Sequence, residues 1–318
     1  MTQIGIFPAS GALGTSTYTH LLSQVPNDKV TLINRYPDKV AKRYVNNGTT
    51  VRQASYESSA EELEAVFSGV DVLFLISFPS HVHQYRTKVQ TKALNAAVKA
   101  GVKHIFYSSL GFASIDKAST KAEVMGAHLD SEAHLRELAR NHPDFSWTSV
   151  REGLYSESFP IYTAFLDLKN PPSRILIPHD GSGPGVSWVK RDELGEATAH
   201  LIASYTKSPS SFTYTNQIVT FTGSKSWTLA ETVAVLSQAA GKEFEIQEVS
   251  VDEYVDLPQI KGYFGTKEKA TTWATAWEAI RAGETAPVTS TLAEILGREP
   301  EPFEKTIEEF ANNALSQT

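Results

Sequence analysis

The chain has 318 residues, of which 41% are hydrophobic and 20% are charged, a composition typical of an ordinary globular protein. Its formal net charge of −7 disfavours a surface that binds nucleic acid through phosphates, so no direct nucleic-acid partner is expected. The absence of cysteine excludes disulfides, thiolate catalysis and cysteine metal ligands. No stretch approaches the roughly 18 to 20 apolar residues of a membrane span, and no charged and apolar leader precedes the first predicted strand. We therefore expect a cytoplasmic protein without a membrane partner.

The first half of the chain alternates short apolar runs with segments of helical periodicity. The predicted strands cover residues 3–7, 29–33, 50–53, 71–76, 103–107 and 145–150. This alternation is typical of βαβ units and predicts an α/β fold with a doubly wound parallel sheet. Beyond Gly153 the rhythm breaks, with a stretch rich in proline and glycine. We predict a first domain over 1–153, completed by parts of 186–222, and a smaller α+β C-terminal lobe over 154–318.

The turn after the first predicted strand carries the small residues that a dinucleotide requires. It consists of Ala9, Ser10, Gly11, Ala12, Leu13 and Gly14. Glycine lets backbone N–H groups approach a pyrophosphate at the positive end of a helix. Gly11 and Gly14 keep the spacing of the dinucleotide fingerprint, whereas Pro8 stands in the place of its first glycine and donates no hydrogen bond. The turn predicts a dinucleotide site, and a glycine turn in another kind of βα unit is the alternative.

A positively charged segment follows the second predicted strand. Arg35 and Lys39 stand where an NAD-selective protein usually has an acidic residue for the ribose hydroxyls. A cation there pairs instead with a 2′-phosphate, and the planar fork of arginine suits phosphate geometry. The segment therefore predicts a preference for NADP(H), and a solvated helix start is the alternative interpretation.

Short polar and aromatic stretches follow the later strands of the first half. Ligands of an open parallel sheet bind beyond the carboxyl ends of the strands, so residues at these ends are candidate contacts of the nicotinamide. The candidates are Ser77, Phe78 and Pro79 after the fourth strand and Ser108 and Ser109 after the fifth, and Ser55 after the third strand is grouped with them. The alternative is that serines simply end strands.

Several segments taken together resemble one protein family. They are the first turn, residues 34–39, "LEAVFSGVDVLF" (63–74), "AVKAGVKHIFYSS" (97–109) and the pairing of "RDELGEATAHLI" with "FTGSKSWTLAETVAVLSQAAGKEFE". Over nearly its whole length the chain resembles the NmrA-like family of atypical short-chain dehydrogenases, which includes isoflavone-reductase-like enzymes and type-2 NAD(P)H quinone oxidoreductases. The resemblance implies a Rossmann-type domain that binds NADP(H), a smaller lobe, and a substrate cleft between them. It also implies that the loop after the sixth strand, with Gly153, passes beside the nicotinamide.

The resemblance to the quinone-reductase branch indicates two candidate proton donors in this chain. This chain has no Tyr-x-x-x-Lys after the fifth strand, and where many relatives carry a lysine four positions before a glutamate it has His128 and Glu132. Spacing of four places them on one helical face, where the carboxylate would orient the imidazole and favour its protonated form. The alternative is an ion pair on the helix surface. Tyr155, in the loop after the sixth strand, is the second candidate donor, and a packing residue is its alternative.

The sequence thus predicts an NADPH-dependent oxidoreductase that reduces a small aromatic, quinone-like or enone substrate. Two alternatives stay open: an NmrA-type redox sensor that binds NADP(H) without turnover and signals to a protein partner, and a non-redox isomerase or cyclase. The histidines are too scattered for a metal site, so no metal is expected. The oligomeric state is also open, and a homodimer is one form that the sequence allows.

Overall fold

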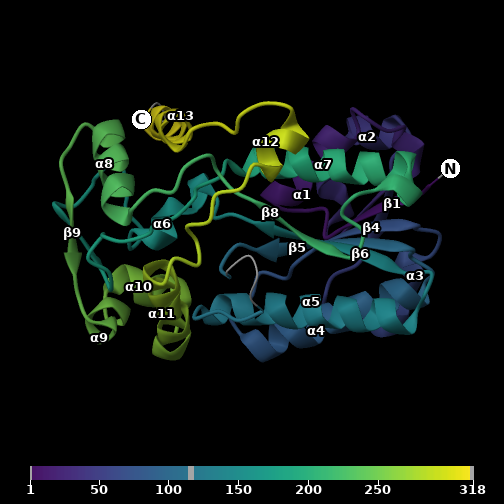
Figure 1. Ribbon diagram of the computed structural model, residues 1–318, viewed down its shortest axis with the longest axis horizontal. Helices are drawn as coiled ribbons and strands as arrows, with labels where there is room; N and C mark the ends of the chain where they lie inside the picture. Colours follow the sequence, from purple (N-terminus) through teal and green to yellow (C-terminus); the bar gives the residue numbers. More distant parts are fainter. Residues whose placement is uncertain (1, 114–117, 316–318) are drawn as a thin grey trace.

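The computed structural model describes residues 2–113 and 118–315 (Figure 1). Its strands are β1 (Ile4–Phe7), β2 (Val30–Asn34), β3 (Thr50–Gln53), β4 (Val72–Ile76), β5 (His104–Leu110), β6 (Ser146–Glu152), β7 (Arg174–Ile177), β8 (Gln217–Phe221) and β9 (Glu245–Glu248). Its α-helices are α1 (Ala12–Leu21), α2 (Lys42–Asn46), α3 (Ala60–Phe67), α4 (His83–Lys99), α5 (Glu123–Asn141), α6 (Phe159–Tyr162), α7 (Arg191–Lys207), α8 (Leu229–Ala240), α9 (Val251–Val255), α10 (Pro258–Phe264), α11 (Lys267–Arg281), α12 (Thr291–Leu296) and α13 (Phe303–Leu315).

The main sheet has seven parallel strands in the order β3-β2-β1-β4-β5-β6-β8. The six strands predicted in the first half are all present, and the predicted doubly wound parallel sheet is confirmed. Two strands run further than expected, because β5 continues to Leu110 and β6 to Glu152. The strand order reverses between β1 and β4, and ligands of such sheets bind beyond the carboxyl ends of the strands at this point.

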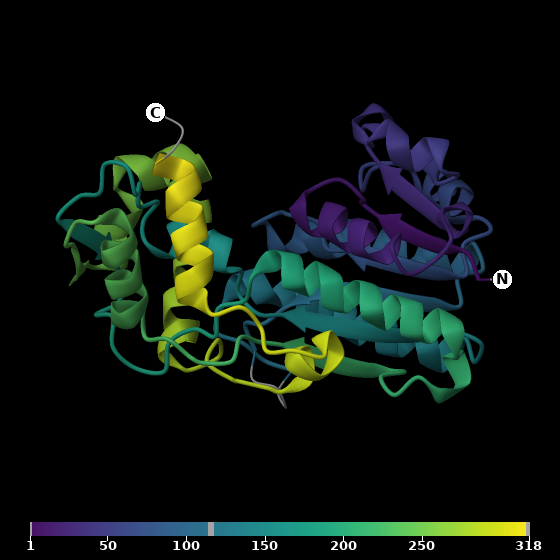
Figure 2. The ribbon, with the colours of Figure 1, turned by 90° about the horizontal axis from the view of Figure 1, so that it is seen from above.

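Successive residues of each strand face opposite sides of the sheet, and each side has its own core. Ile6 and Phe106 pack with α1 and α7, whereas Phe7 and Tyr107 pack in the cluster formed with α3, α4 and α5. Figures 1 and 2 show these two helical layers on either side of the sheet. A residue's place along a strand therefore decides which layer it contacts.

Segments from beyond the sixth strand return to this sheet. β8 pairs with β6 at the sheet edge, α7 packs along α1, and α12 packs against both α7 and β8. Asp192, in the first turn of α7, accepts a hydrogen bond from Ser16 Oγ of α1 at 2.5 Å. The half of the molecule that contains the parallel sheet is thus completed by residues distant in sequence.

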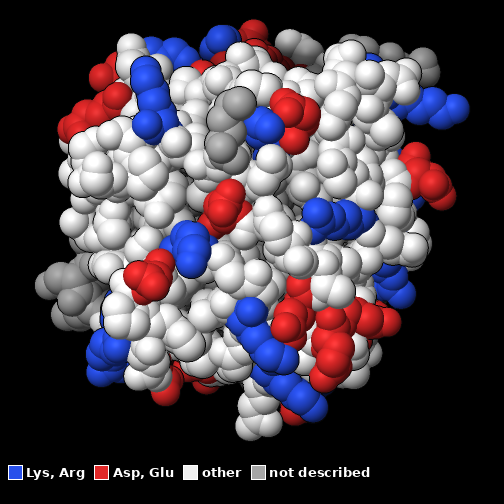
Figure 3. Space-filling view, turned by 90° about the vertical axis from the view of Figure 1, so that its right-hand side faces the viewer, with Lys and Arg blue, Asp and Glu red and all other residues white. Residues whose placement is uncertain are grey.

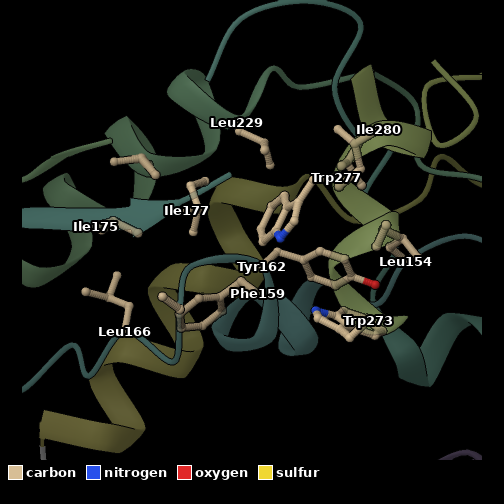
Figure 4. Close-up of a cluster of buried hydrophobic side chains, with 14 of the residues drawn as sticks. Leu154, Phe159, Tyr162, Leu166, Ile175, Ile177, Leu229, Trp273, Trp277 and Ile280 are labelled. Atoms are coloured by element: carbon tan, nitrogen blue, oxygen red, sulfur yellow. The ribbon is translucent and has the colours of Figure 1, made fainter. Parts of the chain in front are cut away.

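The smaller lobe is built around aromatic side chains. β7 and β9 form a two-stranded parallel sheet, and α8, α9, α10 and α11 lie around it (Figure 1). Tyr162, Trp273 and Trp277 meet in the buried core of this lobe (Figure 4). The ring centroids of Tyr162 and Trp273 are 5.6 Å apart. These aromatic side chains are thus part of the buried core of the smaller lobe.

The charge distribution on the surface and the hydropathy of the helices agree with the net negative charge and the moderate hydrophobic content of the sequence. On the face shown in Figure 3, basic and acidic side chains are interspersed and form no continuous basic surface among the described residues. None of the helices in the described ranges is both long and apolar enough to cross a membrane.

Candidate cofactor-binding and active site

A cavity of about 530 Å³ lies at the carboxyl ends of the central strands. This volume falls within the roughly 300 to 1,000 Å³ of ligand pockets. The predicted residues that line it are Ser10, Gly11, Ala12, Leu13, Gly14, Arg35, Ser55, Ser77, Phe78, Pro79, Ser108 and Tyr155. Among the described residues the lining runs from Pro8 to Tyr155, so Tyr155 is its one residue from the predicted C-terminal lobe (154–318).

The first turn has the conformation that close approach of a pyrophosphate requires. Gly11 precedes α1 with φ at 99°, and the space where a Cβ would stand is open. Gly14 is required for packing, because a Cβ there would lie 2.7 Å from the carbonyl oxygen of Ala9. Ala9 does not line the cavity; its N–H donates to the carbonyl oxygen of Ile33 at 2.8 Å and anchors the turn. The turn fits a dinucleotide phosphate even though Pro8 replaces the first glycine.

The segment after β2 brings one cation to the cavity. Arg35 lines it, and its guanidinium lies 3.7 Å from the carboxylate of Glu57, which lines the same cavity. Lys39 is not among the lining residues, although its ammonium lies 5.0 Å from the centroid of the ring of Tyr36, which does line the cavity. Asn34 Oδ1 accepts a hydrogen bond from the backbone N–H of Tyr36 at 2.9 Å and fixes this turn. Of the two predicted cations in this segment, Arg35 is the one that lines the cavity.

Strand alternation separates the two serines of β5. Ser108 lines the cavity, whereas Ser109 points to the opposite side of the sheet and donates to Glu132 Oε1 at 2.9 Å. Gly153 also lies away from the cavity. A Cβ at Gly153 would lie 2.8 Å from the carbonyl oxygen of Phe221, so the glycine serves close packing at the end of β6. The placement of Ser109 and Gly153 beside the cavity is therefore wrong.

The expected pairing of His128 with Glu132 is wrong. Both residues are buried beneath the sheet, with 2% and 1% exposed, and they bond to different partners. Glu132 accepts two hydrogen bonds from Arg151, at 3.0 and 2.7 Å, and further bonds from Ser109 and Ser149. A helix face that packs on a sheet contacts the strands in front of it, so spacing along the helix did not predict the partners.

His128 is held as a neutral imidazole. Its Nδ1 is 3.1 Å from the hydroxyl of Tyr107, and its Nε2 is 2.7 Å from a guanidinium nitrogen of Arg86. Burial and the charges of Arg86 and Arg151 hold the pKa of His128 well below its usual value. His128 does not line the cavity either. These contacts make it a structural partner of Arg86.

Arg86 lines the cavity and was missed by the sequence analysis. It is 7% exposed, and its Nη2 donates to Ser77 Oγ at 3.0 Å. Burial lowers the pKa of its guanidinium, and its Nε has no hydrogen-bond partner. Arg86 belongs to the first turn of α4 and is followed by Lys88, so its sequence context looked like a solvated helix face.

Tyr155 is connected to a second residue that the sequence analysis missed. Tyr155 lines the cavity, and its hydroxyl donates to Glu152 Oε2 at 2.5 Å. Glu152 is 1% exposed and its Oε1 has no hydrogen-bond partner. Burial raises the pKa of Glu152 to about 7, against the opposing effects of Tyr155 and the nearby Ser108 hydroxyl. The only sequence signal was an acidic residue at the end of an apolar strand, three positions before Tyr155.

Other lining residues had weak sequence signals. They are Pro8, Tyr36, Ala54, Tyr56, Glu57 and Ile76. The hydroxyl of Tyr56 donates to the carbonyl oxygen of Ile76 at 2.6 Å and joins the ends of β3 and β4. In residues 2–113 and 118–315, no three acidic or histidine side chains are grouped as metal ligands.

Comparisons with known proteins agree with this geometry. The class defined by the fold and the cavity is that of Rossmann-type dinucleotide-binding proteins with an added lobe. The model of the NmrA-like family matches residues 1–313, and the chain belongs to this family.

Two curated relatives and one solved structure are similar to this chain over most of their length. The NmrA-like family domain-containing oxidoreductase flvB of Aspergillus flavus is 29% identical over 92% of this chain and 90% of its own length. Quinone oxidoreductase 2 of Escherichia coli is 30% identical over 79% of each chain. The crystal structure of the NADPH-dependent quinone oxidoreductase QOR2 of Escherichia coli in complex with NADPH superposes with a TM-score of 0.79 at 25% identity, covering 97% of this chain and 99% of that one.

Proposed function

We propose that this protein is an NADPH-dependent oxidoreductase that reduces a small, flat substrate of quinone-like, enone or aromatic type. The observation that carries the proposal is one cavity lined by the open turn at Gly11 together with Arg35, Ser77, Ser108 and Tyr155. Its family membership and the names of its relatives support the same conclusion.

Each part of the cavity has a role in this proposal. The backbone N–H groups from Gly11 to Leu13 bind the pyrophosphate at the start of α1, and Arg35 pairs with the 2′-phosphate. Phe78, Pro79 and the hydroxyls of Ser77 and Ser108 border the nicotinamide. When bound, the cofactor supplies a hydride, whereas the protein supplies position and exclusion of water.

Tyr155 is the proton donor in this proposal. Tyr155 lines the cavity, whereas His128 does not, and both ring nitrogens of His128 already have partners. Burial raises the pKa of Tyr155 well above its usual value, so the phenol carries its proton at neutral pH. The carboxyl group of Glu152 orients this hydroxyl by accepting its hydrogen bond.

A turnover assay tests the proposal. Purified protein is incubated with NADPH and a panel of quinones and enones, and nicotinamide absorbance and products are followed. We expect oxidation of NADPH that depends on the quinone or enone. Tight NADPH binding without oxidation would contradict the proposal and favour a sensor that acts through a protein partner. Product formation without any absorbance change would instead indicate an isomerase or cyclase.

A further inference from the structure

Arg86 carries a charge that the fold does not balance. No Asp or Glu side chain of residues 2–113 and 118–315 forms an ion pair with its buried guanidinium. Its hydrogen-bond partners are the Ser77 hydroxyl, the neutral His128 imidazole and the carbonyl oxygen of Val124 at 3.4 Å. Burial of a charge without a counter-charge disfavours folding, so packing alone does not explain an arginine at this position.

The nearby carboxylates are committed to other partners. Glu132 pairs with Arg151 at 2.7 Å, and Asp130 pairs with His83 at 2.7 Å. Glu152 accepts a hydrogen bond from the hydroxyl of Tyr155 through Oε2. None of these three carboxyl groups forms an ion pair with Arg86.

The remaining ionisable neighbours are phenols. Tyr56, Tyr107 and Tyr155 act on Arg86 electrostatically, and burial raises the pKa of all three phenols, which therefore stay neutral near pH 7. Arg86 thus contributes a net positive charge to the wall of a cavity of low polarity. A charge in such surroundings interacts strongly with any anion that enters.

We propose that Arg86, with the hydroxyl of Ser77, binds the anionic oxygen that forms on the substrate when hydride is added. This inference rests on the proposed function and assigns the residue pair that stabilises the developing charge. Arg86 and Ser77 both line the cavity, and their bond of 3.0 Å holds the guanidinium in place before a ligand arrives. Donors that are positioned in advance in this way are among the strongest contributors to catalysis.

The electrons and protons of the step balance. The hydride from NADPH forms a C–H bond at a carbon of the quinone or enone, and a π-electron pair moves onto the conjugated carbonyl oxygen. Arg86 and Ser77 stabilise that negative oxygen, which then takes the proton of the Tyr155 hydroxyl. Solvent returns a proton to the tyrosine, so one NADPH and one proton are consumed for each substrate.

Binding of a phenolate tests the anion site without any turnover. The probe is 4-nitrophenol, whose anion is coloured, and the neutral probe 4-nitroanisole is the control ligand. We expect Arg86→Gln to weaken binding of the phenolate by roughly tenfold and to leave 4-nitroanisole binding unchanged. Arg86→Lys, which keeps the charge, should retain part of the affinity, and Arg140→Gln on the exposed side of α5 should change nothing. Equal phenolate affinity in Arg86→Gln and the unmodified protein would overturn the proposal.

Kinetics and stability complete the test. With NADPH and 1,4-benzoquinone, Arg86→Gln should lower kcat by roughly 10²-fold while the Kd for NADPH stays unchanged. Removal of an unbalanced buried charge should not lower the unfolding midpoint, and a large drop would assign Arg86 to structure and contradict the proposal. Failure of the unmodified protein to reduce any quinone would contradict the proposed function, whereas the phenolate measurement would still decide whether Arg86 binds an anion.

Discussion

Four buried charged residues near the carboxyl edge of the sheet differ in whether they form an ion pair. Glu132 of α5 and Arg151 of β6 form an ion pair, and the hydroxyls of Ser109 and Ser149 also donate hydrogen bonds to Glu132. We call Glu132 and Arg151 the matched pair. Arg86 and Glu152 have no such partners: Arg86 faces neutral groups, and Glu152 Oε1 is unbonded. Neither residue of the matched pair lines the cavity, whereas Arg86 does, and Glu152 accepts a hydrogen bond from the lining residue Tyr155. We infer that the matched pair serves folding and the unmatched residues serve a ligand.

The largest expected effect comes from breaking the matched pair. Glu132→Gln leaves the buried guanidinium of Arg151 without its carboxylate, so the free energy of unfolding should fall by about 3–5 kcal/mol. Chemical denaturation at pH 7 measures this loss, and NADPH affinity of the folded fraction should be unchanged. A loss below about 1 kcal/mol would remove the distinction between the two pairs.

The unmatched carboxyl should make stability depend on pH. Because burial raises the pKa of Glu152 from 4.5 to about 7, its favourable contribution is complete below pH 4.5 and is lost as pH rises through about 7. At 1.36 kcal/mol per pKa unit the loss is about 3 kcal/mol. Denaturation across this pH range should show the loss in the unmodified protein.

Glu152→Gln is the matched control for this dependence, because it removes the titrating group and keeps the side-chain shape. Its unfolding free energy should lack that part of the pH dependence and exceed that of the unmodified protein at pH 8. An identical pH dependence in both proteins would show that Glu152 is an ordinary carboxylate.

The arrangement of the strands could be predicted from the sequence. Hydrophobic runs separated by helical segments predicted six strands and the doubly wound sheet, because burial on both faces leaves a clear pattern. The glycine turn and Arg35 were predicted from backbone conformation and charge close to a strand end, and both line the cavity, while their roles in binding the cofactor stay predictions.

Contacts between elements were harder to predict. Ser108 and Ser109 were grouped together because the predicted strand ended at residue 107, whereas β5 continues to Leu110 and turns them to opposite sides. The spacing of His128 and Glu132 describes one helix and says nothing of the strand residues against which its face packs. Arg86 and Glu152 were missed because what distinguishes them is a missing partner, which only the assembled structure reveals.

The cofactor preference should depend on Arg35. Arg35→Asp should weaken NADPH binding by about 2 kcal/mol at low salt, because a charge-assisted contact with the 2′-phosphate is lost, and should affect NADH much less. Lys39→Asp is the matched control in the same segment and should have a smaller effect, because Lys39 is not among the residues that line the cavity. Isothermal titration measures both. Equal affinities of the unmodified protein for NADPH and NADH would contradict the assignment.

The smallest expected effect concerns the acidic neighbour of Arg35. Glu57 lies 3.7 Å from that guanidinium in an exposed ion pair and competes with a bound phosphate. Glu57→Gln should tighten NADPH binding by about 0.5 kcal/mol, in the range of exposed ion pairs, and this gain should shrink as salt is added. NADH affinity serves as the control and should not change. Weaker NADPH binding in this variant would show that Glu57 contacts the cofactor directly.

A crystal structure of the complex with NADP⁺ tests most directly the claim that the unmatched residues serve a ligand. We predict that the pyrophosphate lies against the N–H groups from Gly11 to Leu13 and that the nicotinamide lies beside Ser77, Ser108 and Tyr155, with Arg86 facing the space next to it. His128 and Glu132 should have no contact with the cofactor and should keep their present partners. A nicotinamide seated against His128 or Glu132, with Arg86 turned away from it, would contradict the account.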